Sequence, residues 1–274
     1  MPTRTQYAPG TPSYVDLATT DTAAARDFYG ALFGWDLDEE PTDDGGTYIM
    51  CTRNGSVAAG MMAQGPGMVS QGMPPMWSSY VTVADADEAV GRVGAAGGSI
   101  VMPAMDVMSA GRMAVFADPT GAVSCVWQPR DSIGSEIVNE HGSLTWTELL
   151  TPDVATAAAF YAQVFGWTTE EMPMGDGPPY TVFLLDGDGV AGAMNPPMPG
   201  IPPVWAVYFA VDDCDATADA ATERGATLLA PPSDIPRVAW PRSRIPRARC
   251  SRSSLSPTRR ADAPSAGRCS CRSS

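Results

Sequence analysis

The chain has 274 residues, of which 44% are hydrophobic and 18% charged, a composition typical of a globular protein with a sizeable core. Its net charge of −14, without a single lysine, argues against nucleic acids and anionic membranes as partners, because both require a basic surface. No apolar run approaches the ~18 residues of a membrane span, and the first residues lack the apolar stretch of a signal peptide, so we expect a cytoplasmic protein.

An internal repeat organises the chain. The segment DLATTDTAAARDFYGALFGW (16–35) matches ELLTPDVATAAAFYAQVFGW (148–167) at a constant offset of 132 residues. Further on, MPPMWSSYVTVADAD (73–87) matches IPPVWAVYFAVDDCD (201–215) at an offset of 128. Shared residues at fixed offsets indicate duplication. We therefore predict two copies of one α+β module, residues 13–128 and 143–236, joined by a polar linker over 129–142.

Each copy is predicted to contain a βαβββ unit twice. In the first copy, alternation predicts a strand at 14–18, and Asp21 is a candidate N-cap for a helix that Gly34 ends. Asp85 is a candidate cap for a second helix over 86–96. The remaining strands are predicted at 47–52, 57–62, 78–83, 99–102, 112–117 and 122–127. The second copy is expected to follow the same order.

The six cysteines follow no disulfide or zinc spacing. Cys51, Cys125 and Cys214 stand singly in apolar stretches, and the other three lie in the last 25 residues. We expect the first three to be reduced, buried thiols.

The chain changes character after Pro236. Residues up to that point carry 7 of the 17 arginines and 30 of the 31 acidic residues, whereas 237–274 carry 10 arginines and one acid. A basic, disordered tail is one interpretation. The preferred one is a frameshift: one GC-rich codon choice for 237–254, read two bases on, encodes a segment that parallels 112–127, including its Asp-Pro-x-Gly turn. We expect 237–274 to be irregular and the second copy to be truncated.

Paired βαβββ modules with an FY…LFGW helix and a DPxG turn before the final strand resemble the vicinal oxygen chelate superfamily. That family includes glyoxalase I, extradiol dioxygenases and bleomycin-resistance proteins. The resemblance covers residues 13–236, and the whole arrangement looks most like actinobacterial two-domain members that are glyoxalase-like or hydroxylase-like, some of them in antibiotic gene clusters. It implies an α+β fold in which paired modules form a cup.

Enzymes of that family hold a divalent metal in the cup with His, Glu or Gln, and spacing places the corresponding positions here. In the first copy they are Tyr14, a residue near Gly60, about Ser79, and Cys125; in the second they are Trp146, Gly192 and Val207. These are not metal ligands of the expected type, and the only histidine, His141, lies in the linker. We expect no metal and no cofactor.

Two acidic residues occupy equivalent repeat positions. Alternation puts Asp16 on the same face as Tyr14, and Glu148 on the same face as Trp146. The pairs could contact a planar ligand with a donor or cationic group, or Asp16 and Glu148 could act as general bases. The alternative is structural, a carboxylate that satisfies buried donors. Trp77 and Trp205 also correspond, each after a Met/Pro loop, and either line the cup or pack in the core.

The leading functional hypothesis is metal-independent binding of a small apolar or aromatic metabolite in resistance or secondary metabolism, as in bleomycin-resistance proteins. The second is an enzyme, either a glyoxalase-like lyase or a hydroxylase component. The third is a stress or regulatory protein that uses the fold as a scaffold. A small molecule is the expected partner, and a homodimer is compatible with the sequence.

Overall fold

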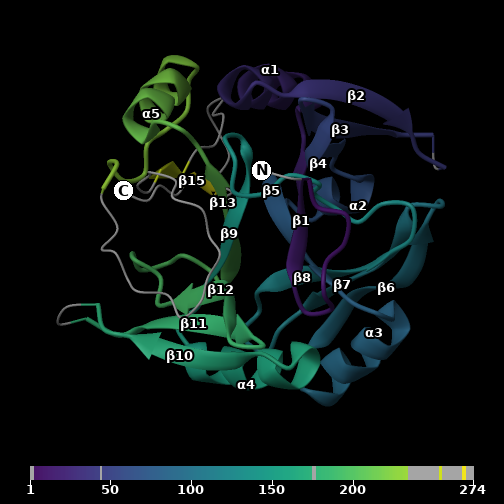
Figure 1. Ribbon diagram of the computed structural model, residues 1–274, viewed down its shortest axis with the longest axis vertical. Helices are drawn as coiled ribbons and strands as arrows, with labels where there is room; N and C mark the ends of the chain where they lie inside the picture. Colours follow the sequence, from purple (N-terminus) through teal and green to yellow (C-terminus); the bar gives the residue numbers. More distant parts are fainter. Residues whose placement is uncertain (1–2, 44, 175–176, 234–252, 255–266, 270–274) are drawn as a thin grey trace.

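Two βαβββ modules form the first half of the fold, as the sequence predicts, although the strand at Asp36–Pro41 is not among the predicted segments (Figure 1). The computed structural model describes residues 3–43, 45–174, 177–233, 253–254 and 267–269. The first module consists of β1 (Pro12–Thr19), α1 (Thr22–Phe33), β2 (Asp36–Pro41), β3 (Thr47–Arg53) and β4 (Ser56–Ala63). The second consists of β5 (Met76–Thr82), α3 (Ala86–Ala95), β6 (Ser99–Val107), β7 (Gly111–Ala117) and β8 (Val123–Pro129).

The second half repeats this order as far as α5, and two short strands follow among the described residues. Its first module consists of β9 (Ser143–Leu150), α4 (Val154–Phe165), β10 (Thr168–Met172), β11 (Tyr180–Leu185) and β12 (Asp188–Met194). Its second consists of β13 (Val204–Ala210), α5 (Cys214–Glu223), β14 (Ser253–Ser254) and β15 (Gly267–Cys269). No helix in the described part of the chain is both long and apolar enough to cross a membrane.

The helix ends confirm the predicted caps. The Asp21 side chain accepts a hydrogen bond from the Ala24 amide at 2.9 Å, and Asp153 does the same for Thr156 at 3.0 Å. Such caps satisfy amides that have no partner within the helix. Gly34 ends α1 in the left-handed conformation, with φ of +66°, which a side chain would strain.

Each half folds into one mixed sheet. The first has the order β2-β3-β4-β1-β5-β8-β7-β6, and the second has β10-β11-β12-β9-β13-β15-β14. In both, the first strand of the half lies centrally, parallel to one neighbour and antiparallel to the other. β15 runs parallel to β13 as β8 runs parallel to β5, so β15 takes the place of β8 in the second sheet.

The outer strands of the second sheet are short. β14 and β15 have two and three residues, whereas β7 and β8 have seven each. They are the regular structure after Pro236 among the described residues. The predicted frameshift falls on residues that lie mostly outside those described. Cys214 forms a disulfide, contrary to the prediction of a reduced thiol, whereas Cys51 and Cys125 are free and buried.

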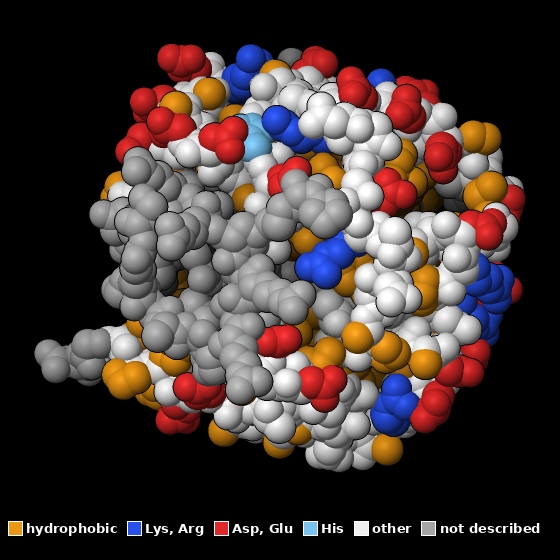
Figure 2. Space-filling model, in the orientation of Figure 1, with side chains coloured by type: hydrophobic (Ala, Val, Ile, Leu, Met, Phe, Trp, Pro, Cys, Tyr) orange, Lys and Arg blue, Asp and Glu red, His pale blue; other side chains and the backbone are white. Residues whose placement is uncertain are grey.

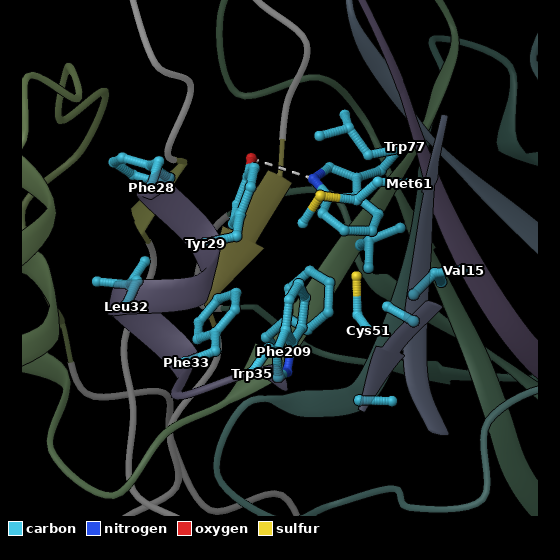
Figure 3. Packing of buried hydrophobic residues seen from close by; sticks show 14 of the residues in the cluster. Val15, Phe28, Tyr29, Leu32, Phe33, Trp35, Cys51, Met61, Trp77 and Phe209 are labelled. Atoms are coloured by element: carbon cyan, nitrogen blue, oxygen red, sulfur yellow. Dashed lines mark hydrogen bonds between the residues drawn. The ribbon is translucent and has the colours of Figure 1, made fainter. Parts of the chain in front are cut away.

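The two sheets pack through shared cores. Helix α1 of the first half contacts α5 of the second, and α3 contacts α4. One core joins Phe33 and Trp77 to Phe209, with the Phe33 and Phe209 ring centroids 4.9 Å apart (Figure 3). The other joins Phe116 to Phe160, with centroids 5.9 Å apart. Each half therefore completes the interior of the other.

Two connections are more structured than predicted. The Met/Pro loop over 63–76 contains a short helix, α2 (Pro66–Ser70). The 129–142 linker is ordered against the first half: the Ser135 hydroxyl donates to the Ala58 carbonyl at 2.8 Å, and Ile137 is buried. Strand β6 also continues to Val107, beyond the predicted end at 102, through two register shifts.

Candidate functional site

A buried carboxylate lies at the centre of the first sheet, on the face opposite α1. Asp16 on β1 is directly across from Gly60 on β4 and Ser78 on β5. Its Oδ2 accepts a hydrogen bond from the Tyr80 hydroxyl at 2.8 Å and a longer one from Tyr48 at 3.4 Å. We call this sheet face, which carries Tyr14, Asp16 and Tyr80, the first cup face.

The tyrosines form a connected cluster over a glycine. The Tyr14 and Tyr48 hydroxyls are 2.9 Å apart. A Cβ at Gly60 would stand 1.9 Å from the Tyr48 hydroxyl and 2.5 Å from that of Tyr14. Only glycine allows both phenol groups to lie across β4, so Gly60 is required by close approach and not by a turn.

Burial determines the protonation of this cluster. Desolvation raises the pKa of Asp16 to about 6, opposed by hydrogen bonds from Tyr80, Ser78 and Tyr48. Desolvation also raises the pKa values of Tyr14, Tyr48 and Tyr80 well above their usual range. The three tyrosines therefore remain protonated phenols near neutral pH, while Asp16 is mostly ionised.

The second sheet repeats the arrangement with conservative changes. Glu148 on β9 accepts a hydrogen bond from the Tyr208 hydroxyl at 2.6 Å. The Trp146 indole donates to the Tyr180 hydroxyl at 2.9 Å, and Tyr180 also hydrogen-bonds with Glu148. A Cβ at Gly192, across from Glu148, would lie 1.9 Å from the Tyr180 hydroxyl. We call this the second cup face.

The structure brings together five of the predicted site residues. Tyr14, Asp16 and Cys125 share the first cup face, since Cys125 lies in the same cluster as Tyr14 and Tyr80. Trp146 and Glu148 share the second.

Three predicted residues lie elsewhere. Ser79 pairs with Val15, whose side chain is in the core, so it faces the helices, and the cup position belongs to Ser78. Trp77 and Trp205 are core residues, and their indoles donate to Tyr29 at 3.2 Å and Tyr161 at 2.8 Å. A shift of one residue along a strand moves a side chain to the opposite face.

Sequence reasoning missed the tyrosines that hold the carboxylates. Tyr48 and Tyr180 are 132 residues apart, as are Asp16 and Glu148, and Tyr80 and Tyr208 follow the second offset of 128. The repeat offsets were thus sufficient to find both pairs. Their contact with the carboxylates depends on strand pairing, which brings β3 and β5 to either side of β1 and β4.

Methionines line the first cup face around the cluster. The strand register pairs each of these methionines with a residue of the adjacent strand that lies on the same face. Met62 and Met105 are exposed to 36% and 45%, and the others are half-buried. The set comprises Met50, Met62, Met76, Met102, Met105 and Met113. Flexible thioethers adapt to apolar ligands of varied shape.

The donor set does not fit a divalent metal. Asp16 is the one carboxylate at the centre of the first cup face, and its neighbours are protonated phenols and the Cys125 thiol, whose pKa burial raises. Zinc, manganese and iron take imidazole, thiolate or several carboxylates. Among the described residues no group of three or more His, Cys, Asp or Glu side chains is placed to hold a metal ion.

Comparison with known proteins identifies relatives over most of the chain. The model of the "Glyoxalase/Bleomycin resistance protein/Dioxygenase superfamily" matches residues 11–126 and 143–238. "Putative glyoxylase CFP32" of Mycobacterium tuberculosis is 47% identical over 239 residues, which cover 87% of this chain and 91% of that protein. "Anthracycline biosynthesis protein DnrV" of Streptomyces peucetius is 37% identical, covering 85% and 88%.

Solved structures share the fold at low identity. A Mn(II)-bound glyoxalase from Novosphingobium aromaticivorans superposes with a TM-score of 0.60 at 14% identity, over 95% of this chain and 81% of that one. The 2,3-dioxygenase LapB from Pseudomonas sp. KL28 gives 0.60 at 15% identity, over 94% and 90%.

Proposed function

This chain belongs to the glyoxalase/bleomycin resistance protein/dioxygenase superfamily, and on that premise we propose that it binds a small, apolar aromatic metabolite without a metal. The observation that carries the proposal is the first cup face itself. A phenol–carboxylate cluster at its centre is surrounded by methionines, and this combines polar anchoring with an adaptable apolar surface.

The relatives support a flat, polycyclic ligand. Two Streptomyces proteins named for anthracycline biosynthesis are 37–38% identical to this chain. An anthracycline is a tetracyclic quinone, broad and planar, with hydroxyl groups that can donate to a phenol or carboxylate. Such a molecule suits a face of thioethers and aromatic rings. We place the protein in secondary metabolism or in resistance by sequestration, in the cytoplasm.

A fluorescence titration tests the proposal. An uncharged tetracyclic quinone aglycone is titrated with the full chain in buffer containing EDTA, and again with added Zn²⁺ or Ni²⁺. We expect saturable binding that EDTA leaves unchanged. Absence of binding, or binding that appears only when metal is added, would contradict the proposal. Trp127→Ala, which removes a ring beside Tyr80, is expected to weaken binding about tenfold.

A second candidate, a glyoxalase-like lyase, is favoured by one observation. Desolvation raises the pKa of Asp16 to about 6, which is suitable for a general base near neutral pH. Asp16 would take the proton from the sulfur-bearing carbon of a hemithioacetal and return it to the neighbouring carbonyl carbon, while the hydroxyl proton moves to the former carbonyl oxygen, so that the product is a 2-hydroxy thioester. Turnover of a hemithioacetal that Asp16→Asn abolishes and Glu148→Gln retains would establish this function. Lack of turnover with any added metal would eliminate it.

A further inference from the structure

We infer that the first cup face recognises a positively charged group, a protonated amine, on its aromatic ligand. This inference rests on the proposed binding function and specifies its ligand class. Three features of the described residues carry it: the direction of the hydrogen bonds at the centre, the charges at the rim, and the absence of any basic side chain on that face among the strands described.

The centre of the face offers acceptors. The Tyr80 hydroxyl donates its proton to Asp16, so the remaining lone pairs of its oxygen are available only as acceptors. Tyr48 lies between the same carboxylate and Tyr14, with oxygen distances of 3.4 and 2.9 Å. A ligand group that contacts these oxygens binds best if it donates hydrogen bonds to them. An ammonium group suits this surface because it has three donors and no acceptor.

The rim of the face is acidic. On the edge strand β2, Asp38 pairs with Met50 and Glu40 pairs with Tyr48, so both carboxylates lie on the cup side. Both are exposed, and the ion pairs seen among described residues do not include them. Figure 2 shows acidic side chains over the β2 region with apolar atoms below them.

The two arginines on strands of the first sheet are directed to the opposite face. Arg53 on β3 donates to the Phe33 carbonyl of α1 at 2.7 Å. Arg112 on β7 donates to Asp87 of α3 at 2.8 Å. Glu39, between the two rim acids, pairs with Arg26 of α1. The helix side of the sheet thus holds both signs, while the described strands of the first sheet place Asp16, Asp38 and Glu40 on the cup side and no arginine there.

The second cup face has fewer acidic residues at the corresponding rim positions. At the repeat offset of 132, Glu170 stands in place of Asp38, and the buried Met172 in place of Glu40. The second cup face therefore has one rim acid where the first has two. The difference lies in residues that face the ligand side, because β10 pairs Glu170 with Val182 and Met172 with Tyr180.

The test compares two forms of one ligand. An anthracycline that carries an aminosugar is titrated against its N-acetylated derivative, which keeps the ring system and loses the charge. We expect the amine to bind about tenfold more tightly than the N-acetyl form at 50 mM NaCl, because ion pairs with two exposed carboxylates can account for a gain of that size. This preference should shrink at 500 mM NaCl, because salt screens exposed charges. Asp38→Asn with Glu40→Gln should reduce this preference for the amine to about twofold.

Glu39→Gln is the matched control, since this residue is on the same strand and faces α1; its variant should keep the full preference. Equal binding of both ligand forms would overturn the inference while leaving the proposed function intact. Failure of both forms to bind would overturn both. Retention of the preference in the double variant would also overturn it.

Discussion

The two sheets share a buried carboxylate held by tyrosine, yet they differ in the strands around it. In the first sheet, β6, β7 and β8 have nine, seven and seven residues and present Met105, Met113 and Trp127 on the cup face. The described counterparts in the second sheet, β14 and β15, have two and three residues. Among the described residues, the repeat is therefore clear at the centre of the face and not in its outer strands.

The two hydrophobic cores do not reflect the difference in outer-strand length between the sheets. Each of the two large cores contains residues from both halves, and no described core residue lies beyond Ala226. The described residues of both halves, up to Ala226, thus form the packing between the two sheets. Substitutions in these cores and substitutions on the first cup face therefore test different parts of the comparison.

The largest expected effect concerns the shared core. Phe209→Ala removes a ring from the second half that packs on Phe33 and Trp77 of the first, and should lower the free energy of unfolding by about 3–5 kcal/mol. Denaturant unfolding followed by circular dichroism and tryptophan fluorescence should show one transition. Two separate transitions would show that the halves are independent. Val101→Ala, at an exposed position, should change little.

The next effect compares the two glycines. Gly60→Ala and Gly192→Ala each force a tyrosine out of place and should each cost about 2 kcal/mol, as overpacking does. Only Gly60→Ala should also abolish binding of the tetracyclic quinone. Thermal denaturation and fluorescence titration measure the two quantities. Equal loss of binding in both variants would mean that both faces bind ligand.

The pH dependence of the free energy of unfolding reports on the ionisation of Asp16. Its pKa is about 6 in the folded chain and 3.8 as a free side chain, so the folded state binds the proton more tightly. The contribution to stability is present in full below pH 4 and is lost as pH rises to about 6, a change of about 3 kcal/mol. Asp16→Asn should flatten this segment of the profile relative to the parent chain. An unchanged profile would contradict the burial of an ionisable Asp16.

Stoichiometry gives a further distinction. Calorimetric titration should give one quinone bound per chain. This binding should be weakened by Trp127→Ala on the first cup face and unaffected by Trp146→Ala on the second.

We also propose that DNA sequencing around codon 236 will reveal an alternative reading frame that encodes longer outer strands. A chain with that frame restored is expected to bind a second equivalent. Two equivalents in the present chain would remove the distinction between the faces.

The smallest expected effect is that of metal. The donors at the cluster are protonated phenols and a single carboxylate, so Zn²⁺ or Ni²⁺ should shift the melting temperature by less than about 1 °C. A differential scanning fluorimetry series with EDTA as reference measures this. Strong stabilisation by either ion would show that the cluster rearranges to bind metal.

Much of the fold could be predicted because its determinants are local. Asp21 caps a helix through its own neighbours, and Gly34 ends it by its own backbone freedom. The candidate site could be predicted in part, since alternation along one strand correctly joined Tyr14 to Asp16. Placing Ser79 failed because register between strands is decided by pairing partners far away in sequence.

By itself, the sequence determined the duplication, the βαβββ order, the helix ends and the pairing of an aromatic residue with an acid at each repeat position. The tertiary structure alone decided that Tyr48 and Tyr80 converge on Asp16, that Trp77 packs in the core, and that each half completes the other's interior. The physical reason is distance along the chain. Capping and alternation act within a few residues, whereas these contacts join strands tens of residues apart and arise only when both sheets bury their apolar faces together.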